Sequence, residues 1–254
     1  MRNESTAAGP VQSVDRALEI LDVLARRGTA GVTEVAGGLG VHKSTASRLL
    51  GTLEARGFVA QDGERGVYRL GFALVRLAGA SAAQLELTQL GRDVCERLSV
   101  ELGEAVNLAV RDGESAVNVS QVRGSASVGV LNWVGRRTPL HATSSGKVLL
   151  AFGPPGLSRT VLTGPMDRFT EATITDAEAL AAALAEVHER GWAATEGELE
   201  AGLNAVAAPV CGADGQLVAA LSVSGPAYRL PPARFAAVAE QVCGAAAEIA
   251  ARLG

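Results

Sequence analysis

One short polar stretch, His42-Lys-Ser-Thr-Ala-Ser-Arg48, places hydroxyl and cationic side chains at the start of a predicted helix over about 43–56. The other side of that helix is apolar, at the i, i+3, i+4, i+7 spacing of Ala46, Leu49, Leu50 and Leu53. Such a polar helix end can enter the major groove of DNA and contact phosphates and base edges. The candidate DNA-binding residues on it are His42, Lys43, Ser44, Thr45, Ser47 and Arg48.

The neighbouring segments predict the elements that would hold this helix in place. An apolar stripe predicts a first helix over 13–27, and a short second helix at 33–38 ends before a glycine turn. Two strands, 58–61 and 67–70, form a hairpin with Arg65 at its tip as a further candidate phosphate contact. Three helices and a hairpin in this order predict a winged helix-turn-helix. A solvated polar face, or a winged helix that binds another protein, remains the alternative.

A second group of residues has the chemistry of an anion site. Near Thr143 a helix is predicted to begin, and its first N–H groups, with the Ser144 and Ser145 hydroxyls, can bind a carboxylate without a charged side chain. Ser222 and Ser224 alternate along a predicted strand and therefore face one side, which we expect to be the pocket. The alternative is that these serines only cap a helix and pack on a sheet. Further candidates are an apolar wall from Trp133 and polar contacts from Asn118 and Asn204.

Catalysis has weak support in the sequence. His141, Ser144 and Glu198 are the types of a nucleophile set, but no GxSxG elbow presents the serine. Gly146-Lys147 does not belong to a phosphate-binding loop, because Val148 stands where a Ser or Thr is needed. Three histidines and three cysteines lack the spacing of metal ligands, so neither a metal nor a cofactor is expected.

Charge is divided unevenly along the 254 residues. The net charge is -4, yet residues 42–76 carry six cations against three anions, so a small basic segment lies within an acidic chain. Three widely spaced cysteines favour a reduced, cytoplasmic setting. No apolar run reaches the roughly 18 residues of a membrane span, and residues 1–10 are expected to be a disordered leader without a signal-peptide core.

The second half of the chain predicts an α+β fold. Strand-like apolar segments at 106–110, 116–122 and 127–133 are followed by helical segments near 143–152 and 175–190, then by two further strands, 205–210 and 217–224, and a closing helix at 231–253. Strands, then helices, then strands favour an antiparallel sheet. Helical patterns also span 71–102, the first part of which we expect to link two domains.

Six segments resemble the IclR-type bacterial transcriptional regulators. Three resemble the family's N-terminal domain: VQSVDRALEILDVLA, VTEVAGGLGVHKSTASRLLGTLEARGFV and YRLG. Three resemble its C-terminal domain: RRTPLHATSSGKVLLA, ELEAGLNAVAAPV and GQLVAALSVSGPAYRL. The resemblance covers residues 11–253 and implies a winged helix at 11–70, a linker helix at 71–85 and a GAF-like effector-binding domain at 86–254. The finer similarity is to regulators of glyoxylate and allantoin catabolism.

The resemblance also implies an effector site. Ser144 and Ser145 match positions whose backbone amides hold the effector's carboxylate, and Glu198 fits the family pattern. Pocket positions are matched by Val130, Thr195, Ala205, Ser222 and Ser224. The sequence departs from the family where Thr195 replaces an Asp or Ser, and where Cys211-Gly212 replaces an aromatic residue or His followed by Asp or Asn. These departures bear on which effector is bound.

We therefore expect a DNA-binding regulator that represses catabolic genes and is controlled by a small carboxylate metabolite. Family members bind palindromic operators as homodimers or dimers of dimers, and effector binding would change the dimer through the linker helix. An activator of the same class is the first alternative, and a small-molecule hydrolase is the second.

Overall fold

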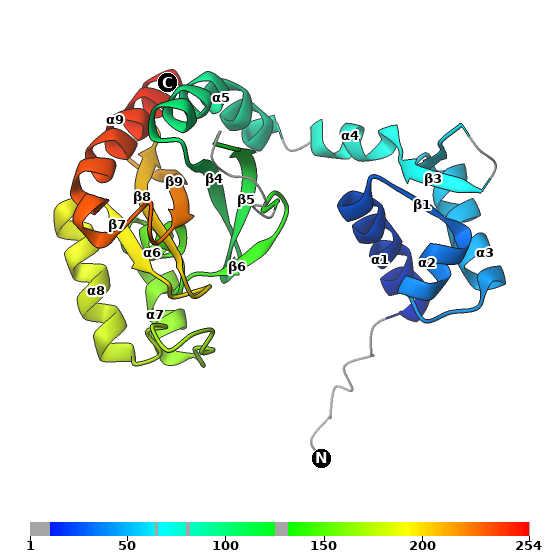
Figure 1. Ribbon diagram of the computed structural model, residues 1–254, viewed down its shortest axis with the longest axis horizontal. Coiled ribbons are helices and arrows are strands. Elements are labelled where there is room, and N and C mark those ends of the chain that lie inside the picture. The colour runs from blue at the N-terminus through cyan, green and yellow to red at the C-terminus, as the bar shows by residue number, and fades with distance from the viewer. Residues whose placement is uncertain (1–10, 64–65, 80–81, 125–131, 254) are drawn as a thin grey trace, which may run out of the picture. The chain divides into compact units, whose positions relative to one another are not determined.

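A computed structural model describes residues 11–63, 66–79, 82–124 and 132–253, with only the backbone described for residues 78–79 and 82–85. The chain forms two compact units, Met1–Leu85 and Glu86–Gly254 (Figure 1). Each unit has its own core and is treated separately below. None of the helices within these ranges is both long enough and apolar enough to cross a membrane.

The N-terminal unit combines helices with a small antiparallel sheet whose strand order is β1-β3-β2. The predicted helices and hairpin are all present. An additional strand, β1, pairs with β3 but is too short to show a strand pattern in the sequence. The elements are α1 Gln12–Arg27, β1 Thr29–Gly31, α2 Val32–Gly38, α3 Lys43–Ala55, β2 Val59–Gln61, β3 Val67–Leu70 and α4 Phe72–Gly79.

The core of this unit determines which side of α3 faces solvent. Ala46 and Leu50 of α3 are fully buried against Ile20 and Leu24 of α1 and Val35 of α2. Because the apolar stripe of α3 is used in this core, its polar side is left outward. The N-terminal unit is thus a helix-turn-helix with a β-hairpin wing, as the sequence predicts.

The C-terminal unit is built on a six-stranded antiparallel sheet of order β6-β5-β4-β9-β8-β7. The predicted α+β class is confirmed, whereas the predicted strand at 127–133 falls mostly outside the described residues. The elements are α5 Ala82–Leu102, β4 Ala105–Asp112, β5 Ser115–Val122, β6 Arg137–Pro139, α6 Ser144–Phe152, α7 Pro155–Thr163, α8 Ala177–Arg190, β7 Ala193–Glu196, β8 Leu203–Cys211, β9 Leu217–Pro226, the 3-10 turn η1 Pro232–Arg234 and α9 Phe235–Leu253.

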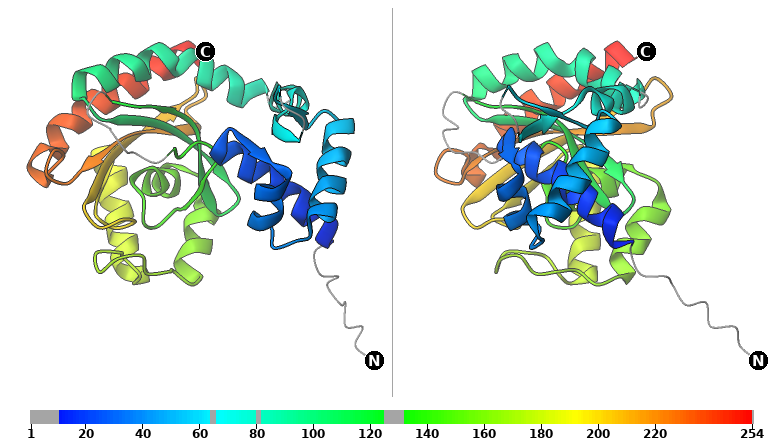
Figure 2. Two further views of the ribbon diagram at one scale, coloured as in Figure 1. Left: turned by 45° about the vertical axis from the view of Figure 1, so that its right-hand side comes forward. Right: turned by 90° about the vertical axis from the view of Figure 1, so that its right-hand side faces the viewer.

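The two faces of this sheet carry different side chains. One face presents Leu108, Leu221 and similar residues to α5 and α9, which cover it (Figure 1). The other face is covered by α6, against which α8 packs, and the buried apolar strand residues there include the small Ala116, Ala193, Ala207 and Ala220. Figure 2 shows α6 lying inside the curve of the sheet. Since small strand residues fill little space, this face leaves room for a cavity beside α6.

Candidate functional site

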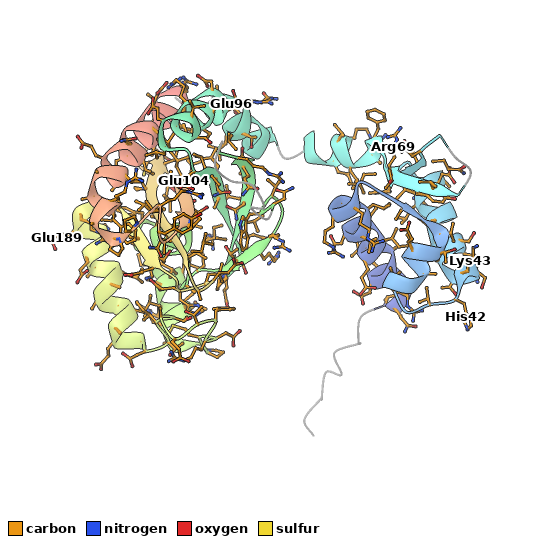
Figure 3. All side chains as sticks on the ribbon, in the orientation of Figure 1. His42, Lys43, Arg69, Glu96, Glu104 and Glu189 are labelled. Carbon is orange, nitrogen blue, oxygen red and sulfur yellow. The ribbon has the colours of Figure 1, made fainter. Side chains whose placement is uncertain are left out.

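The polar side of α3 is open to solvent. His42, Lys43, Ser44, Ser47 and Arg48 are exposed, and Thr45 is half-buried. Figure 3 shows the side chains of His42 and Lys43 directed away from their unit. Neither Lys43 nor Arg48 pairs with a carboxylate among the described residues. Both charges are therefore available to an anionic partner.

The wing contributes a second, weaker cationic group. Arg69 on β3 is half-buried, and its Nε lies 3.3 Å from a carboxylate oxygen of Asp62. Arg65, which the sequence places at the hairpin tip, lies outside the described residues. The described part of the interface therefore consists mainly of α3.

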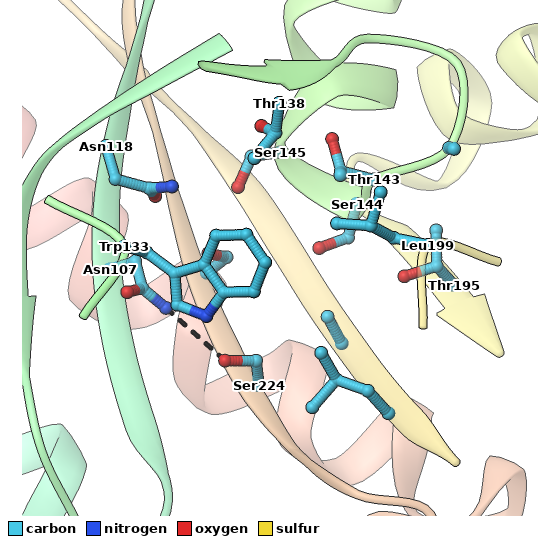
Figure 4. A pocket seen from close by; sticks show the side chains of 14 residues that line it. Asn107, Asn118, Trp133, Thr138, Thr143, Ser144, Ser145, Thr195, Leu199 and Ser224 are labelled. Carbon is cyan, nitrogen blue, oxygen red and sulfur yellow. Dashed lines mark hydrogen bonds between the residues drawn. The ribbon is translucent and has the colours of Figure 1, made fainter. Parts of the chain in front are cut away.

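A cavity of about 60 Å³ lies in the C-terminal unit, between the start of α6 and the sheet (Figure 4). That volume corresponds to a few water molecules or one small organic molecule. No charged side chain lines it among the described residues. The lining residues are Asn107, Asn118, Trp133, Thr138, Ala142, Thr143, Ser144, Ser145, Thr195, Leu199, Leu203, Ala205, Ser222 and Ser224.

The α6 N-terminus supplies backbone donors to this cavity. Thr143 caps the helix, because its hydroxyl accepts from the Gly146 N–H at 3.0 Å. The N–H groups of Ser144 and Ser145 have no acceptor among the described residues. Gly146 allows the preceding turn to close on the helix, since a Cβ there would lie 2.3 Å from the Leu140 carbonyl oxygen.

Four hydroxyl side chains add to these donors. Those of Ser144, Ser145, Thr195 and Ser222 are at least nine-tenths buried and have no hydrogen-bond partner within the described part of the chain. These four residues line the cavity, and their hydroxyls are available to a group that enters it, so such a cluster favours a polar occupant. A negative ligand suits it best, because two free N–H groups and the positive end of the helix dipole meet there.

Most of the predicted effector-site residues come together in this cavity. Val130 lies outside the described residues. Glu198 and Asn204 are not among the residues that line the cavity. Those that do line it are Trp133, Ser144, Ser145, Thr195, Ala205, Ser222 and Ser224.

Glu198 is instead part of a buried ion pair. Lys147 Nζ lies 2.6 Å from Glu198 Oε1, and both side chains are less than a tenth exposed. Burial raises the pKa of the Glu198 carboxyl, and the neighbouring Lys147 ammonium acts in the opposite direction. Lys147 therefore holds one oxygen of the Glu198 carboxylate, and Glu198 does not line the cavity as the sequence-based expectation would require.

Asn204 also has a structural partner. Its Nδ2 donates to the Leu230 carbonyl oxygen at 2.9 Å, which ties β8 to the segment before α9. Asn204 does not line the cavity, whereas Ala205, the next residue of β8, does. Consecutive residues of a strand face opposite sides of the sheet, which accounts for the difference.

Two asparagines of the sheet complete the cavity wall. Asn118 was a candidate from the sequence, whereas Asn107 was not predicted. A usable signal was present for Asn107, because it is the one amide in the otherwise apolar strand segment 105–110. A polar residue in a buried strand requires a partner, and it is therefore a candidate ligand contact.

The residues of the hydrolase alternative are engaged separately. A ring nitrogen of His141 lies 2.9 Å from the Asp167 carbonyl oxygen, and its ring packs on Phe169. Glu198 is paired with Lys147. The set His141, Ser144 and Glu198 is therefore not hydrogen-bonded as a nucleophile and its base would be.

Comparison with known proteins gives a consistent result. The IclR helix-turn-helix domain matches residues 13–63, and the bacterial transcriptional regulator IclR C-terminal domain matches residues 79–251. The chain is 35% identical over 246 residues to the HTH-type transcriptional regulator XynR of Escherichia coli K12, covering 96% of this chain and 98% of that one. It is 34% identical to the HTH-type transcriptional repressor AllR of Salmonella typhimurium LT2, covering 99% and 93%.

A solved structure is similar over both units. It is an IclR homolog from Microbacterium hydrocarbonoxydans, complexed with 4-hydroxybenzoate. The TM-score is 0.80 at 30% identity, covering 95% of this chain and 97% of that one.

Proposed function

The chain belongs to the IclR family of bacterial transcriptional regulators, and on that premise we propose that it represses catabolic genes until a small carboxylate effector binds. It is a DNA-binding regulator with an effector domain and not an enzyme. One relative bears the name of a repressor, which supports repression as the direction of control.

The proposal of a carboxylate effector rests on the groups at the start of α6. Its two free N–H groups meet four buried, unpartnered hydroxyls in a cavity without charged side chains. A carboxylate would accept from these donors, and the helix dipole would favour its negative charge. The homolog crystallised with 4-hydroxybenzoate binds a carboxylate-bearing compound, which supports the same class for this chain.

The effector class is tested by titrating the full chain with small carboxylates in calorimetry and thermal unfolding. Glyoxylate, other 2-oxo acids, allantoate and 4-hydroxybenzoate are the first probes. We expect Ser222→Ala to weaken binding of the best probe by about tenfold, because one hydrogen bond is lost. The control is Ser158→Ala, whose hydroxyl bonds only to the Pro155 carbonyl on α7. Absence of binding by every carboxylate would contradict the proposal.

We further propose that α3 reads the operator, with Lys43 and Arg48 binding phosphate or guanine. The double substitution Lys43→Ala with Arg48→Ala should weaken binding to duplex DNA enriched by this chain from a random pool. It should also reduce the salt dependence of binding, by roughly two ions per subunit if both contact phosphate. The control Arg92→Ala with Arg159→Ala removes the same charge from the C-terminal unit. It should change neither the affinity for DNA nor its salt dependence. Unchanged binding by the α3 variant would contradict its role.

Operator binding is proposed to require a second copy of the chain, because one winged helix makes few phosphate contacts. Apolar side chains stand exposed on two helices of the N-terminal unit: Val14 and Leu18 of α1, and Phe72 and Val75 of α4 are each more than half exposed. Such residues favour a protein partner over solvent. Leu18→Glu should shift the sedimentation coefficient towards that of the monomer or of a smaller assembly. A wild-type chain that is already monomeric would contradict the need for a second copy.

The proposed location is the bacterial cytoplasm. The DNA partner is found there, and Cys95, Cys211 and Cys243 are all free thiols, as a reducing compartment would keep them. Fractionation of the producing bacterium would test this placement, and recovery from the periplasm would contradict it.

A further inference from the structure

The cavity wall opposite the α6 serines includes a second polar group that the carboxylate site does not use. Asn107 of β4 is 5% exposed and lines the cavity. Its Oδ1 is buried and has no hydrogen-bond partner among the described residues. A buried acceptor without a partner costs free energy, so a donor that enters the cavity and reaches this oxygen would be stabilised there.

The other end of the Asn107 amide is only weakly bonded. Its Nδ2 lies 3.4 Å from Ser224 Oγ, which is beyond the usual range for an N–H···O hydrogen bond (Figure 4). Because Nδ2 is the end that faces Ser224, the open end is the Oδ1 acceptor, and its missing partner is a hydrogen-bond donor. The site at Asn107 is therefore incomplete without a ligand.

Strand register explains why this amide faces the same space as the serines. Asn107 is paired with Ser222 across the β4–β9 ladder, and Ala109 on the same side of β4 is paired with Asn118 of β5. Residues opposite one another across antiparallel strands point to the same face of the sheet. The Asn118 amide is also buried, and within the described residues its side chain has no partner.

We propose that Asn107, together with Asn118 and Ser224, forms a second subsite that recognises a neutral hydrogen-bond donor, a hydroxyl or amide group, on the carboxylate effector. The effector class is then a small acid with two polar ends: the carboxylate at α6 and the neutral donor at β4–β5. No cation is present at this end to hold a second carboxylate among the lining residues. This inference rests on the carboxylate site proposed above and adds the feature by which the effector is distinguished from a simple acid.

The test compares matched acids with and without the second group. The probes are propionate against 3-hydroxypropionate, and benzoate against 4-hydroxybenzoate, titrated into the full wild-type chain by calorimetry. In at least one pair the hydroxylated acid should bind about tenfold more tightly, because the donor completes the Asn107 site. Equal affinity within every pair that binds would overturn the second subsite while leaving the carboxylate proposal intact. Binding of glyoxylate or another 2-oxo acid, with none of these four acids binding, would overturn the second subsite alone. Absence of binding by all of these carboxylates would overturn both.

A variant assigns the preference to Asn107. In Asn107→Ala the preference for the hydroxylated acid of the pair should fall to about twofold or less. Asn204→Ala is the matched control, since it removes another buried asparagine of the same sheet that bonds to Leu230 and does not line the cavity. It should keep the full preference even where its melting temperature falls. If Asn107→Ala keeps the preference, the assignment is wrong. If the variant does not fold, the wild-type titrations decide, and a wild-type chain without a preference within the pairs also contradicts the assignment.

Discussion

The chain has two lysines, and their surroundings are opposite. Lys43 is exposed on α3, where its charge is free for a DNA phosphate. Lys147 is buried in α6, one turn beyond the serines of the cavity, and forms an ion pair with Glu198. Removing the single carboxylate partner of a buried ammonium leaves an unpaired buried charge, which destabilises the folded chain. Lys147 therefore joins α6 to the loop after β7, and this contact supports the position of α6 beside the cavity.

This role predicts a strong coupling between the two residues. Lys147→Met or Glu198→Gln alone should each destabilise the chain by about 3 kcal/mol, because each leaves one buried charge unpaired. The double variant should be much less destabilised than the sum of the two. Denaturant unfolding of the four chains measures the coupling. Additive effects would show that the pair contributes little, and a large loss of effector affinity at unchanged stability would indicate direct contact with the effector.

Residue positions in the cavity were predictable where a local structural rule applied, or where the family resemblance supplied them, as it did for Thr195 and Ala205. Alternation in a strand places Ser222 and Ser224 on one face, and an N-cap places Ser144 and Ser145 at a helix start. Glu198 follows β7 in a loop, where no period gives the direction of a side chain. Its partner Lys147 is 51 residues away in sequence, so the pairing emerges only in the folded chain.

At the scale of elements, the wing depends on a close backbone contact at the base of its hairpin. A Cβ at Gly71 would lie 2.2 Å from the Gly57 carbonyl oxygen, which is backbone and cannot rotate away. Gly71→Ala should therefore destabilise the N-terminal unit by roughly 2 kcal/mol or more and weaken DNA binding. Gly51→Ala in α3 is the control, because nothing lies within 4 Å of a Cβ there and alanine favours the helix.

Thermal unfolding of the Gly71 and Gly51 variants distinguishes crowding from a general effect of replacing glycine. The Gly51 variant should be as stable as the wild type or slightly more so. If both variants are equally stable, the contact between Gly57 and Gly71 does not restrict the wing.

The contact between α5 and α9 predicts that the free energy of unfolding depends on pH in the acid range. Arg252 of α9 forms two hydrogen bonds with Asp93 of α5, at 2.5 and 2.9 Å, and lowers the pKa of that carboxyl from 3.8 to about 2. A lowered folded-state pKa stabilises the fold above pH 3.8, and this contribution is lost as the pH falls through about 2. These side chains are exposed, so the effect is modest and decreases with added salt.

The measurement compares wild type with Arg252→Gln in urea at pH 6 and at about pH 2.5. The wild type should be the more stable chain at pH 6, and its advantage should shrink at the lower pH. An advantage that is the same at both pH values would contradict the role of Asp93 as the partner.

Long elements were predictable, and so were the short strands β2 and β3, which a polar hairpin loop separates, but the other short strands were not. The stripes of α1, α3 and α9 each extend over several turns, which is enough to reveal a helical period. By contrast, β1, β6 and β7 have only three or four residues each, and α7 begins with a proline within a segment of mixed polarity. Such elements form because a neighbouring strand or helix offers hydrogen bonds and apolar contacts, and this information lies elsewhere in the chain.

For the whole molecule, the separation of its two functions has a thermodynamic consequence. The cavity belongs to Glu86–Gly254, whereas α3 belongs to Met1–Leu85. On the proposed assignment, effector and DNA bind different residues, and a complex containing both should exist. If a saturating effector lowers the affinity for DNA by some factor, DNA must lower the affinity for the effector by that same factor.

We expect this factor to be finite and on the order of tenfold, within the usual range for coupled sites. It is measured twice on the full chain: by DNA titrations with and without saturating effector, and by effector titrations with free and DNA-bound protein. Equal, finite factors would establish coupling between separate sites. An effector that cannot bind the DNA-bound chain at all would instead mean direct competition for one surface, and that result would contradict the assignment of the two functions to different units.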